Sequence, residues 1–285
     1  MKRTALVALA PLLLAGCGAD ASSNEDGKRI EAEFYPLQYV AQRVAGDEYT
    51  VNNLTKPGQE PHDTELSLQK TASLSDATVV FYEKGLAAQV DDAIETAGPK
   101  HVVDAAQAAD LDGEDPHFWL DPTRLSKVAE AFEQELSEAD PDNADRFAAN
   151  LEALQADLAE LDSAFEAGLA TCSINTVVVS HDAFGYLGKR YGLEIVGING
   201  LTPETEPSPA HIAELHDLIE TDHITTVFNE ELASAQMAAT LADDLGLKTA
   251  VLDPIEGLSD DTEDEDYLSL MEKNLETLRT ANQCT

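Results

Sequence analysis

The sequence predicts an α/β fold in which two parallel-sheet lobes are joined by one long, rigid α-helix. Short β-rich runs alternate with helical stretches in both halves of the chain, and one amphipathic helical segment separates the halves. The chain has 285 residues, of which 43% are hydrophobic, enough to bury two modest cores. We expect an N-terminal lobe over residues 29–140, a linker helix over 141–170 and a C-terminal lobe over 171–285.

Residues 1–16 have the pattern of an export signal. A basic start is followed by an apolar run over residues 5–14, which is too short to cross a bilayer but fits a signal peptide. The run leads into Leu-Ala-Gly-Cys, ending at Cys17, which resembles the lipobox of bacterial lipoproteins. The resemblance implies cleavage before Cys17 and attachment of a lipid to its thiol, with residues 17–28 as a flexible tether. An ordinary secretory signal is the alternative.

Each lobe is expected to contain four strands. The candidates in the first lobe are residues 29–34, 49–54, 77–81 and 101–104, and those in the second are 176–180, 194–198, 225–228 and 249–252. Because helical stretches separate them, the strands should be parallel, with their carboxyl ends at one edge of each sheet. Open α/β sheets bind ligands beyond that edge.

The linker helix is predicted from the spacing of its apolar residues. Every third or fourth position is apolar, at Phe147, Leu151, Leu154, Leu158, Leu161 and Phe165. Pro141 and Asp142 are typical of a helix start, and Gly168 lies near the expected end. A coiled-coil dimer is the alternative interpretation of this stripe. We favour a helix that packs across both lobes, in a monomer.

Two cysteines remain besides Cys17, namely Cys172 and Cys284. Outside the cytoplasm two such thiols usually pair, so we predict a disulfide that ties the C-terminus to the start of the second lobe. In the chain-entropy model, closing a loop of this length stabilises the fold by about 4–5 kcal/mol. Free buried thiols and metal ligation are the alternatives.

The charge of the chain excludes one class of partner. The sequence has 17 Lys and Arg residues against 55 Asp and Glu residues, for a formal net charge of −38 at pH 7. Such a surface repels phosphate groups, so we predict no binding to nucleic acid. We interpret the acidity as a solvated anionic surface, and the acidic run Asp260–Asp266 as a solvated loop.

Three of the seven histidines occupy positions typical of a binding site. His62 lies in a turn-rich loop after the second strand candidate, His181 directly follows a strand, and His117 lies in a loop before a helix start. Asp253 and Glu230 also follow strand candidates. Three imidazoles and one carboxylate are a suitable donor set for Zn²⁺. We therefore predict a metal site formed by His62, His117, His181 and Asp253.

Several motifs resemble, in their order along the chain, those of the metal-binding proteins of ABC importers for zinc and manganese. They are Phe34–Leu37, Gly58–Asp63, Asp115–Pro122, Ser180–Tyr186, Phe228–Glu230 and Leu252–Leu258. The resemblance covers nearly everything after Lys28. It implies that the metal is held in the cleft between the lobes and is delivered to a membrane permease driven by a cytoplasmic ATPase.

The resemblance also implies roles for single residues. It assigns metal ligation to His62, His117, His181 and Asp253. Glu230 matches a family glutamate near the site, and we expect it, together with Glu60, to support the ligands without binding the metal. Manganese members tend to carry a carboxylate where this chain has His181, so the histidine favours zinc.

We therefore expect a lipid-anchored protein on the outer face of the cell membrane that captures Zn²⁺ and delivers it to an ABC importer permease. We expect no enzymatic activity. The alternatives are a manganese-type importer protein, a zinc-dependent hydrolase and an adhesin. A hydrolase would need a general base, for which Glu60 or Glu230 could serve, but the sequence has no His-Glu-x-x-His motif.

Overall fold

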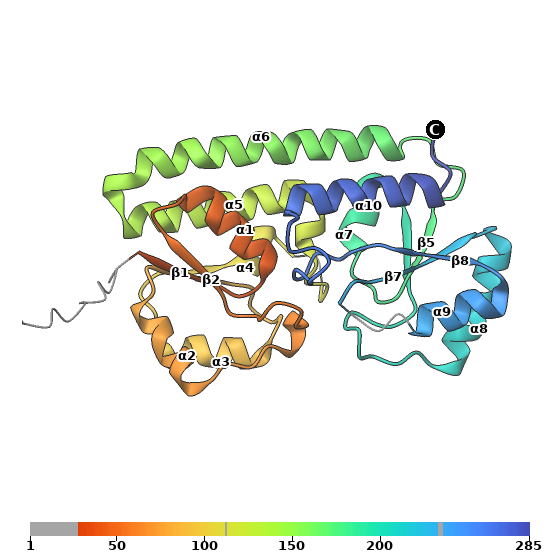
Figure 1. Ribbon diagram of the computed structural model, residues 1–285, viewed down its shortest axis with the longest axis horizontal. Helices are drawn as coiled ribbons and strands as arrows, with labels where there is room; N and C mark the ends of the chain where they lie inside the picture. The colour runs from red at the N-terminus through yellow and green to blue at the C-terminus, as the bar shows by residue number, and fades with distance from the viewer. Residues whose placement is uncertain (1–27, 112, 233–235) are drawn as a thin grey trace, which may run out of the picture.

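The computed structural model describes residues 28–111, 113–232 and 236–285. Two α/β lobes lie side by side, and one long helix, α6 (Ala144–Leu169), runs along both of them (Figure 1). The predicted fold class is therefore confirmed. The predicted signal peptide and Cys17 lie outside the described residues. No helix in the described ranges is long and apolar enough to cross a membrane.

The N-terminal lobe contains a parallel sheet with the strand order β2-β1-β3-β4. Its strands are β1 (Arg29–Ala32), β2 (Thr50–Asn53), β3 (Val79–Tyr82) and β4 (Val102–Asp104). Its helices are α1 (Tyr35–Ala45), α2 (Leu68–Ser73), α3 (Ala88–Ala97), α4 (Ala105–Ala109) and α5 (Pro122–Ala139). Side chains alternate across the sheet: Val79 and Phe81 pack in the core shared with α1 and α5, and Val80 packs in a separate cluster with α3.

The C-terminal lobe repeats this architecture with the order β6-β5-β7-β8, again parallel. Its strands are β5 (Thr176–Val179), β6 (Glu194–Gly197), β7 (Thr226–Asn229) and β8 (Lys248–Val251). Its helices are α7 (Gly185–Tyr191), α8 (Pro209–Thr221), α9 (Gln236–Leu245) and α10 (Tyr267–Ala281). Short 3₁₀ turns occur at Pro61–Asp63, Leu74–Asp76, Phe118–Leu120 and Pro141–Asn143. Strands are found at all eight predicted places, with ends that differ by a few residues.

Helix α6 buries its predicted apolar stripe inside the molecule. Its buried side chains are Phe147, Leu151, Leu154, Leu158, Leu161, Phe165 and Leu169. They pack against α1 and α5 of the first lobe and α10 of the second. Ion pairs fix the flanks of the helix, from Arg43 of α1 to Asp157 and from Arg190 of α7 to Asp162. The stripe is therefore used within the chain and is not available for a coiled coil.

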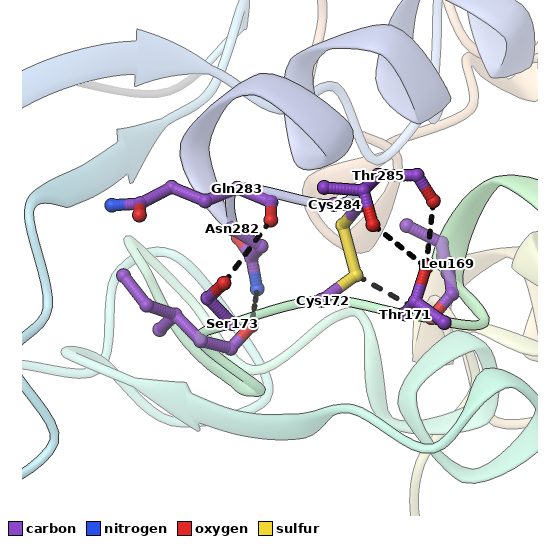
Figure 2. The surroundings of a disulfide bond; sticks show 9 residues. Leu169, Thr171, Cys172, Ser173, Asn282, Gln283, Cys284 and Thr285 are labelled. Atoms are coloured by element: carbon purple, nitrogen blue, oxygen red, sulfur yellow. Dashed lines mark hydrogen bonds between the residues drawn. A yellow bond between two sulfur atoms is a disulfide. The ribbon is translucent and has the colours of Figure 1, made fainter.

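Cys172 and Cys284 form a disulfide, as predicted (Figure 2). Hydrogen bonds surround it: the Thr171 hydroxyl donates to the carbonyl oxygen of Thr285 at 2.6 Å, and the Ser173 amide donates to the carbonyl of Asn282 at 3.1 Å. The C-terminal end is thus held against the segment that connects α6 to β5.

Two carboxyl groups, of Glu33 and Glu83, are buried at the carboxyl ends of β1 and β3. Both residues are at most 1% exposed, and Glu33 Oε2 accepts the backbone N–H of Glu83 at 2.7 Å. The other three carboxyl oxygens have no hydrogen-bond partner among the described residues. Burial raises the pKa of Glu33 to about 8, with the charges of Asp91 and Asp104 acting in the same direction. Burial and the charge of Glu33 also raise the pKa of Glu83 well above its usual range.

This pair predicts that the free energy of unfolding falls as the pH rises from about 5 to about 8, because the folded state then keeps protons that the unfolded state has released. Each such proton contributes a slope of about 1.4 kcal/mol per pH unit. The double variant Glu33→Gln/Glu83→Gln should flatten the slope, whereas Glu160→Gln, exposed on α6, should not. Denaturant unfolding at a series of pH values measures this. A double variant with the wild-type slope would contradict the assignment.

Candidate metal centre

Three histidines and one glutamate bring their ligand atoms together between the lobes. One atom each from His62, His117, His181 and Glu256 lies within 4.8 Å of the others. His117 Nε2 is 3.3 Å from His181 Nε2 and 3.2 Å from Glu256 Oε1. Glu256 Oε1 is also 3.5 Å from His181 Nε2 and 3.7 Å from His62 Nε2. A tetrahedral zinc ion with bonds of about 2.0–2.1 Å separates its donors by roughly 3.3 Å, so these residues fit the ion.

Each lobe supplies two of these side chains. His62 lies in the 3₁₀ turn that follows β2, and His117 directly precedes the turn at Phe118–Leu120. His181 comes two residues after the end of β5, and Glu256 lies in the loop after β8. His117, His181 and Glu256 are at most 1% exposed. Three of the four residues, His62, His181 and Glu256, thus lie in loops that follow strands, as expected for open α/β sheets.

The carboxylate in this cluster differs from the sequence prediction. The structure brings the three predicted histidines together, but Glu256, and not Asp253, completes the cluster. The reason is local: Asp253 Oδ1 accepts the backbone N–H of Ile255 at 2.8 Å, and the residue lines a cavity of about 440 Å³ near α10. The motif Leu252–Leu258 contains both acids, so the sequence alone offers Glu256 as an equal candidate.

Two further carboxylates lie against the Nδ1 atoms of the imidazoles. Glu230 Oε1 lies 2.7 Å from His181 Nδ1 and accepts the backbone N–H of His181 at 3.1 Å and the hydroxyl of Ser180. Asp115 Oδ1 lies 2.8 Å from His117 Nδ1 and accepts its backbone N–H at 3.0 Å. A carboxylate on Nδ1 directs Nε2 towards the metal.

Such a supporting role is predicted from the sequence for Glu230 but not for Asp115. The signal was present, because Asp115 lies two residues before His117 in the motif Asp115–Pro122. Gly185 makes room for this carboxylate: an added Cβ there would lie 2.6 Å from Asp115 Oδ2.

The charges in the cluster are mutually dependent. Burial would lower the pKa of His181, but contacts with Glu230 and Glu256 outweigh it and raise the pKa to about 10. The pKa of His117 is also raised against burial, by Asp115 and Glu256. Burial would raise the pKa of Glu256, yet the surrounding imidazoles hold it well below its usual range. Without a metal the cluster therefore holds protons on its histidines.

Glu60 lies beside the cluster without joining it. Burial and the neighbouring carboxylate of Glu256 raise the pKa of Glu60 to about 9. Its Oε1 is buried and has no hydrogen-bond partner among the described residues. Glu60 is therefore protonated at neutral pH, and a cation close to Glu256 would favour its ionised form.

The sequence is similar to those of known zinc-uptake proteins. Residues 30–281 match the family described as zinc-uptake complex component A, periplasmic (ZnuA). The zinc-binding lipoprotein AdcA of Streptococcus pneumoniae is 36% identical over 299 residues, covering 96% of this chain but 59% of its own length. The chain thus spans little more than half of that relative. The high-affinity zinc uptake protein ZnuA of Bacillus subtilis is 31% identical, covering 96% of this chain and 95% of its own length.

Solved structures show the same fold. The Zn(II)-bound ZnuA-like domain of Streptococcus pneumoniae AdcA has a TM-score of 0.78 at 37% identity, covering 90% of this chain and 99% of that domain. The laminin-binding protein of Streptococcus agalactiae, described as having adhesin and metal transporting activity, has a TM-score of 0.82 at 29% identity, with coverage of 90% and 99%. This chain therefore belongs to the family of zinc-uptake complex component A.

Proposed function

We propose that this protein binds Zn²⁺ between its lobes and delivers it to the permease of an ABC importer. The observation that supports this most strongly is the cluster of His62, His117, His181 and Glu256. Three imidazole nitrogens and one carboxylate oxygen suit Zn²⁺, whereas Mn²⁺ favours more oxygen donors. The zinc-bound relative with the same fold supports the same cargo.

We further propose that the protein works as a monomer outside the cytoplasm, held to the outer face of the membrane by a lipid on Cys17. The lipobox-like sequence that ends at Cys17 supports this location. The description of AdcA as a lipoprotein and of the family as periplasmic supports it as well.

The geometry favours a carrier over a zinc hydrolase. A hydrolase keeps one coordination position open for water, whereas four protein donors converge here. Of the two candidate general bases, Glu230 is already engaged with Ser180 and with the backbone of His181. We do not propose the adhesin activity of the streptococcal relative, because no described feature of this chain favours it.

His181→Ala should lower the affinity for Zn²⁺ by more than about 100-fold, because it removes one of four donors and leaves Glu230 without its imidazole partner. His216→Ala, on α8, is the matched control and should bind zinc like the wild type. Titration of the metal-free protein with Zn²⁺ in the presence of a chromophoric chelator measures both. Wild-type affinity in His181→Ala would contradict the proposed site.

The zinc affinity should rise with pH between about 6 and about 9, by up to about tenfold per pH unit for each proton displaced. The sign follows from the raised pKa values of His181, about 10, and His117, because zinc binds only the neutral imidazoles. Chelator competition at several pH values gives the slope, and calorimetry in buffers of different ionisation enthalpy counts the protons. A pH-independent affinity would argue against histidine ligands.

The lipid anchor has a separate test. Cys17→Ala should move the protein from the membrane fraction to the soluble extracellular fraction, because the thiol that accepts the lipid is lost. Cell fractionation measures the distribution, and Ser22→Ala, in the predicted tether, serves as a control that leaves Cys17 in place. Retention of Cys17→Ala in the membrane fraction would contradict lipid anchoring through this residue.

A further inference from the structure

The turn that carries Glu256 contains an unusual backbone conformation. Ile255 has a φ of +58°, in the left-handed region, and its side chain is completely buried. A β-branched side chain disfavours this region strongly, because its Cβ crowds the backbone. The other described non-glycine residues with positive φ are Asp110, His223 and Gln283, none of them β-branched. Backbone strain of this kind persists only where surrounding contacts enforce it.

Asp253 supplies one of these contacts. Its Oδ1 accepts the N–H of Ile255 at 2.8 Å, across the turn. Asp253 is itself fixed by Asn274 of α10, whose side-chain oxygen accepts the Asp253 N–H at 2.9 Å and whose amide nitrogen donates to the Asp253 carbonyl at 2.6 Å. Asn274 is 2% exposed, so these hydrogen bonds are shielded from water.

Trp119 supplies a second contact, from the other lobe. Its indole N–H donates to the carbonyl oxygen of Pro254 at 2.7 Å, two residues before Glu256. Trp119 is completely buried and follows His117 by two residues, with ring centroids 5.2 Å apart. Its own carbonyl accepts the hydroxyl of Tyr267, at the start of α10, at 2.5 Å. One residue thus joins the backbone beside His117 to the turn that carries Glu256.

The Glu256 carboxylate depends on this turn for its direction. Neither of its oxygens accepts a hydrogen bond from a described backbone amide, hydroxyl or side-chain amide. The three imidazoles and Glu60 lie beside it. The backbone from which it projects therefore has to place the carboxylate beside these imidazoles.

We propose that Asp253 and Trp119 are positioning residues for Glu256. Asp253 selects the left-handed conformation of Ile255, and Trp119 fixes the turn against the opposite lobe, so that Glu256 faces the three imidazoles. This proposal rests on the proposed zinc site. It makes Asp253 important as a hydrogen-bond acceptor, whereas a metal ligand would be important for its charge.

Replacement of Asp253 separates the two roles. Asp253→Asn keeps an acceptor oxygen for the Ile255 amide and should retain zinc affinity within about threefold, whereas Asp253→Ala should lose about 10- to 100-fold. Asp261→Asn, in the same cavity, is the matched control for loss of one negative charge. Equal losses in Asp253→Asn and Asp253→Ala would overturn the proposal, as would wild-type affinity in Asp253→Ala.

Glycine at position 255 gives a second, independent test. Gly adopts positive φ without penalty, so Asp253→Ala/Ile255→Gly should regain at least half of the logarithmic loss in affinity, even though the double variant loses buried side-chain volume and unfolds more easily. If Asp253→Ala lowered the zinc affinity only by destabilising the fold, the double variant would lose still more affinity. That result would overturn the proposal.

Cobalt provides a spectroscopic signature of the ligand set. The visible spectrum of the Co²⁺-loaded protein should change in Asp253→Ala towards that of Glu256→Gln, and should stay like the wild type in Asp253→Asn.

Trp119→Phe, which keeps an aromatic ring but removes the N–H, should speed zinc release about 3- to 10-fold. An unchanged spectrum in Asp253→Ala, or unchanged release in Trp119→Phe, would overturn the role of that residue. Failure of the wild-type protein to bind Zn²⁺ would instead overturn the proposed function.

Discussion

Mutual compensation of buried charges between the lobes is the constraint on which the rest of the structure depends. His117, His181 and Glu256 are at most 1% exposed, and burial opposes the charged form of each. Their charged forms are stable in the interior because protonated imidazoles face an ionised carboxylate. A divalent cation can take the place of those protons and satisfy the same carboxylate. The same residues therefore form a stable metal-free cluster and a donor set for zinc.

This charge compensation requires that the two lobes be held in fixed positions relative to each other. Helix α6 packs against helices of both lobes along one apolar stripe, and Arg190 links α7 to Asp162 of that helix. Nearer the site, the indole of Trp119 and the amide of Gly58 donate to carbonyl groups of the loop that carries Glu256. These contacts cross between the lobes at the site itself. Opening the lobes would therefore break specific hydrogen bonds as well as expose the cluster.

Periodicity and strand position predicted most of the fold and three of the four clustered side chains. The apolar spacing of α6 predicts a buried stripe. His62 and His181 lie in loops that follow strands, and His117 lies in a loop before a helix start. The sequence did not predict Glu256 as part of the cluster, because its position depends on the turn at Ile255. Isoleucine rarely adopts the left-handed backbone conformation that this turn contains. Asp253 lies closer to the end of β8, and a carboxylate is a suitable zinc ligand. Its carboxylate instead accepts the backbone N–H of Ile255 within the turn. The buried pair Glu33 and Glu83 was not predicted either, since acidic residues in such an acidic sequence are expected on the surface.

X-ray absorption spectroscopy of the zinc-loaded protein tests the central claim most directly, because it reports the atoms bound to the metal. We expect four-coordinate zinc with three imidazole nitrogens and one carboxylate oxygen at about 2.0–2.1 Å. The same measurement on Glu256→Gln should show a changed oxygen contribution with all three imidazoles retained. Fewer than three imidazoles in the wild type, or a coordination shell unchanged by Glu256→Gln, would contradict this ligand set.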